Sequence, residues 1–135
     1  MKDRHLYIVA LLFAIAFHLV GCEKLTVPTI TDATVEELTP GAISAKATMT
    51  SKEIDEYGLI YSTKNTSPDL SSKDAIVKGN LEGSSFTAEV TLKTNTTYYF
   101  VFYATNEKGT TYSTATKLTT SLYNPSIDDN PFPKP

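Results

Sequence analysis

The sequence predicts an all-β fold, a seven-stranded antiparallel β-sandwich that follows an N-terminal signal helix. After residue 21, about seven short runs are rich in β-branched and aromatic residues, the composition of strands. Gly, Pro, Asn and Asp separate these runs at intervals of roughly ten residues, as turns do in sandwiches. No stretch of this region shows the repeat of an amphipathic helix.

The most informative stretch runs from Leu92 to Gly109. Every residue from Tyr98 to Thr105 is aromatic, β-branched or Ala, so we expect a strand in mid-sheet with both faces in use. The stretch ends in Asn-Glu-Lys-Gly, where the final Gly permits the positive φ of a hairpin turn.

The other elements are predicted in chain order. The first strand, Pro28–Leu38, begins with a proline, which has no N–H to give to a sheet and suits an edge strand. After a Pro-Gly turn, Ile43–Met49 alternates between apolar and polar residues, which indicates a half-buried strand. Residues 63–73 are polar and predict a solvated loop. The remaining expected strands are Tyr57–Ser62, Asp74–Gly79, Ser85–Leu92, Thr97–Asn106 and Thr110–Thr120.

The N-terminal residues have the pattern of a secretory signal over residues 1–21. Lys2 and Arg4 precede an apolar run, which is shorter than the roughly 20 residues of a membrane-spanning helix. The run ends in Leu-Val-Gly-Cys at residues 19–22, which resembles the lipobox of bacterial lipoproteins. The resemblance implies cleavage between Gly21 and Cys22, a diacylglyceryl thioether on the Cys22 sulfur and acylation of its amine. An uncleaved membrane helix and secretion with a free thiol are the alternatives.

These features divide the chain into four parts. Residues 1–21 form the signal peptide, and residues 22–27 form a short lipidated linker that keeps the domain close to its membrane. Residues 28–121 form the sandwich, and residues 122–135 form a Pro-rich tail that we expect to be disordered. In bacterial lipoproteins of the kind that the lipobox resembles, Asp after the cysteine is a signal for inner-membrane retention. Glu23 stands here instead, so the resemblance implies the outer membrane of the bacterial envelope, with the domain facing either the periplasm or the outside.

The stretch from Leu92 to Gly109 resembles the E–F corner and F strand of a fibronectin type III domain, and the resemblance extends over residues 28–121. It implies a tyrosine corner, in which the Tyr98 hydroxyl bonds to backbone near the corner. The Trp that is usual in strand B is missing, and Ala47 lies near its position. The matching positions are Leu92, Thr96, Tyr98, Phe100, Phe102, Ala104, Asn106 and Gly109.

Composition argues against catalysis and against nucleic-acid binding. The chain carries a net charge of −3, and removal of Lys2, Asp3 and Arg4 with the signal leaves −4, with no basic cluster. Its two histidines, His5 and His18, lie in the signal, and its one cysteine is the lipobox residue. We therefore expect no enzyme, no cofactor and no metal site.

A candidate binding face follows from the alternation of the long strand. If Tyr98, Phe100 and Phe102 point inward, their neighbours point outward, where Tyr offers a flat ring with a polar tip to a protein or sugar partner. The alternative is ordinary cross-strand pairing on a solvated sheet. The predicted function is a lipid-anchored interaction or adhesion module; a glycan-binding accessory lipoprotein of a polysaccharide-uptake system and a structural spacer are the alternatives. The predicted face comprises Ile60, Tyr99, Val101, Tyr103 and Tyr112.

Overall fold

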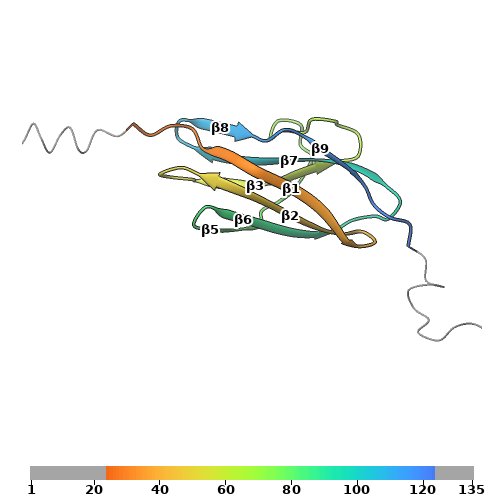
Figure 1. Ribbon diagram of the computed structural model, residues 1–135. Helices are drawn as coiled ribbons and strands as arrows, with labels where there is room; N and C mark the ends of the chain where they lie inside the picture. The colour runs from red at the N-terminus through yellow and green to blue at the C-terminus, as the bar shows by residue number, and fades with distance from the viewer. Residues whose placement is uncertain (1–23, 124–135) are drawn as a thin grey trace, which may run out of the picture.

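The computed structural model describes residues 24–123, and within this range the chain forms strands and loops without a helix. No helical segment of this range has the length and apolar character that a bilayer crossing requires. The expected signal helix, Cys22 and most of the Pro-rich tail lie outside the described residues. Two antiparallel sheets pack on each other, so the prediction of an all-β, two-sheet antiparallel fold is confirmed (Figure 1).

The first sheet has the strand order β1-β2-β6-β5. Its long hairpin turns at Gly41, where φ is +84° and an added Cβ would lie 2.5 Å from the Leu92 carbonyl oxygen. The edge strand β1 carries a bulge at Asp32, whose φ of 53° breaks the regular pairing with β2. The strands of this sheet are β1 (Thr29–Thr39), β2 (Ala42–Thr50), β5 (Asn80–Glu82) and β6 (Ser85–Thr91).

The second sheet has the order β4-β3-β7-β8, and β9 also pairs with β7. The strand that the sequence marks most strongly, β7, is therefore central, with β3 on one side and β8 and β9 on the other. Its residues alternate as predicted, since Tyr98, Phe100 and Phe102 belong to the core between the sheets, whereas the buried Val101 and Tyr103 do not. The strands of this sheet are β3 (Glu56–Ser62), β4 (Ala75–Val77), β7 (Thr97–Asn106), β8 (Gly109–Tyr112) and β9 (Thr116–Thr119).

The prediction of seven strands is wrong for the described residues, because two segments differ. The sequence predicts no strand between Gly79 and Ser85, but residues 80–82 form the short strand β5, which makes a tight hairpin with β6 through Gly83 at φ +59°. The expected strand Thr110–Thr120 is divided into β8 and β9. Ser113 lies at the division. Its backbone N–H donates to the Phe102 carbonyl, and its hydroxyl accepts from the Phe102 N–H, each at 2.9 Å.

The core lies between the two sheets and confirms the alternation predicted for β2, and β6 alternates in the same way. Phe86 stands directly opposite Ala47 in the β2–β6 ladder and meets Phe102 edge-on, with ring centroids 5.8 Å apart. Large rings thus fill the space beside the small side chain of Ala47. The buried core residues are Ile43, Ala45, Ala47, Met49, Leu59, Phe86, Ala88, Tyr98, Phe100, Phe102 and Ala104.

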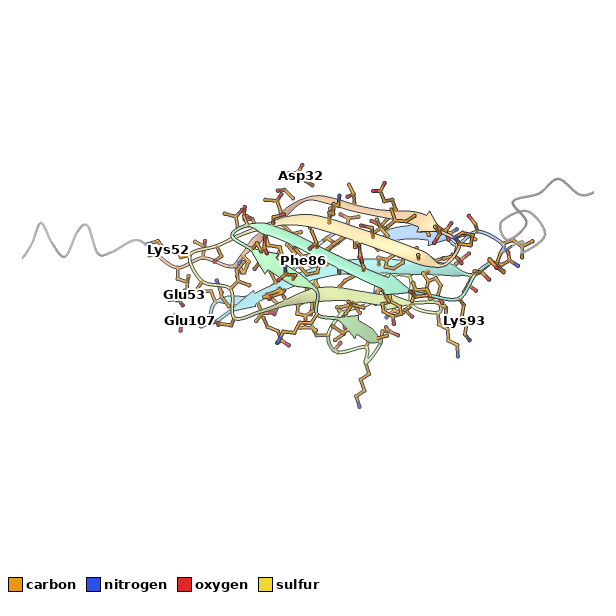
Figure 2. All side chains as sticks on the ribbon, turned by 90° about the horizontal axis from the view of Figure 1, so that it is seen from below. Asp32, Lys52, Glu53, Phe86, Lys93 and Glu107 are labelled. Carbon is orange, nitrogen blue, oxygen red and sulfur yellow. The ribbon has the colours of Figure 1, made fainter. Side chains whose placement is uncertain are left out.

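The two ends of the described chain lie at opposite ends of the sandwich (Figure 1). The near end, as we call it, is where the chain enters at residue 24; it carries the β2–β3 loop and the β7–β8 turn. The far end is where the chain leaves at residue 123; it carries the β1–β2 turn and the β6–β7 loop. Figure 2 shows the same division, with Lys52, Glu53 and Glu107 at the near end and Lys93 at the far end.

Candidate functional site

The predicted binding face is on the outer side of the second sheet, but most of it is buried. The cross-strand pair Ile60 and Val101 is 0% and 2% exposed, and Tyr103 is 2% exposed. The predicted exposure is therefore wrong for these three residues. Tyr99 is half-buried, and of the five residues only Tyr112 is exposed, at 41%. The five residues share one side of the sheet as predicted, yet they do not form an open aromatic patch.

The segment 63–74 covers this face. Pro68 in its middle is fully buried, and the backbone N–H of Leu70 donates to the Tyr112 hydroxyl at 3.2 Å. Since β7 lies between β3 and β8, a segment that leaves β3 and reaches Tyr112 must cross the outer side of β7. The buried residues beneath it are not part of the core between the sheets, so they form a second, smaller apolar cluster.

Internal hydrogen bonds hold segment 63–74 in place. The Ser62 hydroxyl accepts from the backbone N–H groups of Lys64 and Asn65, and the Asn65 amide donates to Asp74 at 3.2 Å. The Asp69 carboxylate accepts from the hydroxyl and N–H of Ser71 and from a further backbone N–H. The Ser71 bonds lower the pKa of Asp69, as the bond from Ser72 lowers the pKa of Asp74. The predicted solvated loop is therefore an ordered cover.

Tyr103 is the largest side chain under this cover. Its ring lies against Gly58, where an added Cβ would come within 2.8 Å of the Tyr103 Cε1. Burial raises the pKa of the Tyr103 hydroxyl, and the charge of Glu56, to which this hydroxyl is hydrogen-bonded, raises it further. The phenol therefore stays neutral at physiological pH and serves as a buried donor.

Tyr98 has the hydrogen bond that a tyrosine corner requires. Its side chain is 5% exposed, and its hydroxyl accepts from the backbone N–H of Lys93 at 3.1 Å. Thr120, which is 2% exposed, binds the same loop through its hydroxyl, which donates to the Lys93 carbonyl and accepts from the Thr96 N–H. The end of the last strand is thus tied to the β6–β7 loop.

Two polar clusters at the ends of the sandwich escaped the sequence analysis. At the far end, the Glu37 carboxylate accepts from the N–H groups of Gly41 and Ser121 and from the Ser121 hydroxyl. At the near end, the Asn106 side chain is 3% exposed and joins three segments of the chain. The sequence offered one hint for each, a carboxylate on an inward-facing position of β1 and an Asn before a Gly turn.

The described residues contain neither His nor Cys, and within them no group of three or more potential metal ligands comes together. Every buried side-chain nitrogen or oxygen among them has a hydrogen-bond partner. A groove of about 570 Å³ lies beside β6 and is lined by polar groups that include Lys46, Asn80 and Glu89.

The chain was compared with protein-family models and with curated proteins, and none of them matches it in sequence.

Proposed function

We propose that this chain is a lipid-anchored protein of the bacterial envelope that binds partners through a fibronectin type III-like domain and has no catalytic activity of its own. The observation that carries the proposal is the position of the single cysteine. Cys22 closes a lipobox-like sequence immediately before a domain whose first described residue is Lys24. Several acyl chains on one residue give stable attachment, since each buried CH₂ contributes about 0.8 kcal/mol.

The strand arrangement supports the domain assignment. One sheet of β1, β2, β6 and β5 faces another of β4, β3, β7 and β8, which resembles the division of strands in immunoglobulin-like sandwiches. The bond from the Lys93 N–H to the Tyr98 hydroxyl lies at the start of β7, where the resemblance places a tyrosine corner. Such domains serve mainly as spacers and binding modules, so the site of interaction has to be argued from the surface.

The far end is the surface that we propose for a protein partner. Leu38 and Leu122 are 59% and 69% exposed, and they follow Glu37 and Ser121, which are hydrogen-bonded to each other. Two exposed leucines beside a hydrogen-bonded pair give an apolar contact with a polar border, as protein interfaces have. We propose this location in place of the aromatic face predicted from the sequence, because most of that face is buried.

The anchor is tested by labelling cells with a fatty acid analogue. The wild-type protein should carry the label and the Cys22→Ala variant should not; label on the variant would contradict the anchor. The interaction is tested by placing a photoreactive amino acid at Leu38 and, as the matched control, at Glu107 on the opposite end. A crosslinked protein obtained only from position 38 would support the proposal, whereas the same products from both positions would contradict it.

The groove beside β6 favours one second candidate, the binding of a glycan. Lys46 and Asn80 offer donors and Glu89 offers an acceptor, the groups that sugar hydroxyls use. A glycan panel with the wild type and Glu89→Gln tests it, with Glu36→Gln on the exposed side of β1 as control. Binding that only the Glu89 variant loses would support the candidate, and indifference to every glycan would contradict it.

A further inference from the structure

The first described residues are clamped to the body of the sandwich. The Asn106 amide donates to the Thr26 carbonyl at 2.7 Å, to the Ser51 hydroxyl at 3.1 Å and to the Glu53 carbonyl at 3.2 Å. Its own carbonyl oxygen accepts from the Lys108 N–H at 2.8 Å. One buried side chain therefore joins the entering chain, the β2–β3 loop and the β7–β8 turn.

A second contact extends this clamp along the chain. The Thr111 hydroxyl on β8 donates to the Pro28 carbonyl at 2.6 Å, and Pro28 itself is fully buried. The Val27 side chain lies against Gly109, where an added Cβ would be 3.2 Å from it. The segment from Thr26 to Pro28 is thus part of the folded domain rather than part of a flexible linker.

The clamp limits the free length of any anchor at Cys22. Three residues stand between Cys22 and Thr26, and four Cα–Cα steps span at most about 14 Å. The sandwich is longer than this, because β7 alone, with its 10 residues, covers about 30 Å from the far end to the near end. A domain held so closely at one end cannot turn its far end toward the anchor.

We propose that the near end of the domain is a membrane-facing surface, whose partner is the headgroup layer of the lipid bilayer, and that the domain stands end-on with its far end held away. This inference rests on the lipid anchor proposed above. The near end carries charges of both signs, among them Lys52, Glu53 and Glu107 (Figure 2). The clamp and the short linker, and not attraction to charged lipid, therefore set the orientation, which makes it insensitive to salt.

Energy transfer from the protein to the membrane tests this orientation. The full lipoprotein, purified from membranes, is reconstituted into phospholipid vesicles that contain acceptor-labelled lipids. A donor dye is attached to a cysteine introduced as Glu107→Cys at the near end or as Lys93→Cys at the far end; both side chains are exposed. The lipidated Cys22 is a thioether and does not react with the dye.

Transfer from position 107 should exceed transfer from position 93 by roughly twofold or more, because the two ends differ by about 30 Å in height. The difference should persist at high salt. A flexible Gly/Ser insertion of about 12 residues between Glu23 and Lys24 should remove most of it. Equal transfer from both positions, stronger transfer from position 93, a difference that salt abolishes or one that the insertion leaves unchanged would each overturn the inference.

Flotation of the vesicles separates this inference from the proposed anchor. Protein that fails to float lacks its acyl chains, which contradicts the anchor. The same pair of donor positions is then compared after the Cys22 thiol has been coupled to a maleimide lipid, with the dye placed through an unnatural amino acid. The clamp predicts the same twofold order of transfer in that preparation, and its absence would overturn the inference independently of the anchor.

Discussion

The carboxylate of Glu37 accepts a hydrogen bond of 2.9 Å from the backbone N–H of Ser121, which joins the first strand to the end of the last. Burial raises the pKa of Glu37, but the bonds from Ser121 and Gly41 outweigh it, so the pKa lies below its ordinary value of 4.5. A carboxyl group with a lowered pKa stabilises the fold above its unfolded-state pKa. This contribution is lost as the pH falls through the folded-state value.

We therefore expect Glu37→Gln to be less stable than the wild type at pH 7, by up to about 1 kcal/mol for this partly solvated group. The difference should shrink as the pH falls below 4.5 toward 3, because the wild-type carboxylate is then protonated too. Denaturant unfolding at the two pH values measures it. Glu36→Gln, on the exposed neighbour, is the control and should change little at either pH. An equal loss at both pH values would argue against the charged bonds.

The second apolar cluster, on the outer side of the second sheet, contains Ile60, and the exposed Ile76 is a matched control for it. Ile60 and Ile76 are directly opposite each other in the β3–β4 ladder, yet they are 0% and 46% exposed. Ile60→Ala should lower the free energy of unfolding by about 2–5 kcal/mol, the usual cost of a cavity in a packed interior. Ile76→Ala should cost clearly less. Similar small losses in both variants would mean that segment 63–74 does not cover the sheet.

The tyrosine corner that we propose at Tyr98 predicts a loss of about 1 kcal/mol for Tyr98→Phe, because this change removes one acceptor and leaves the Lys93 N–H without its partner. The melting temperature and the hydrogen exchange of the Lys93 amide both report on it. Tyr99→Phe, on the other side of the same strand, is the control. An unchanged melting temperature together with unchanged exchange at Lys93 would contradict the corner.

Close packing of Tyr103 on Gly58 predicts that Gly58→Ala destabilises the domain by about 1–3 kcal/mol, since the new Cβ would be 2.8 Å from the ring. The Val77 carbonyl oxygen, at 3.0 Å, limits any adjustment of the strand. A double-mutant cycle with Tyr103→Leu separates the two contacts. The cost of Gly58→Ala should be smaller in the Leu background, and additive losses would show that the ring is not the obstacle.

Strand positions and the side that each strand residue faces could be predicted from the sequence, but the paths of the loops could not. Alternation fixed which residues of β2, β6 and β7 face the core, because successive side chains of a strand point to opposite sides. It also placed Tyr98 and Tyr103 on opposite sides of β7, and the structure agrees, because Tyr98 belongs to the core between the sheets and the buried Tyr103 does not. The uninterrupted apolar character of β7 predicted a central strand with both faces in use, but we expected the second face to be exposed, and it is buried. The second side is covered by the loop that contains Pro68 and Leu70, and the path of this loop cannot be predicted from its polar sequence.

The end clusters were missed for a related reason. Asn106 meets Thr26 across 80 residues of sequence, and Glu37 meets Ser121 across 84. Neither partner is visible from local composition, since Thr and Ser are frequent throughout the sequence. The split of the last predicted strand has a similar origin, because Ser113 acts through two bonds to Phe102 that a strand-forming composition conceals.

The opposite exits of the chain have a mechanical consequence. β1 enters at the near end and β9 leaves toward the far end, so a pull between an anchored N-terminus and a bound far end acts along the strands. The ladders of β1 with β2 and of β9 with β7 would then be loaded in shear, with many hydrogen bonds resisting together instead of opening one by one. Single-molecule stretching between the two termini should give a higher rupture force than stretching between the near-end loops at residues 53 and 107.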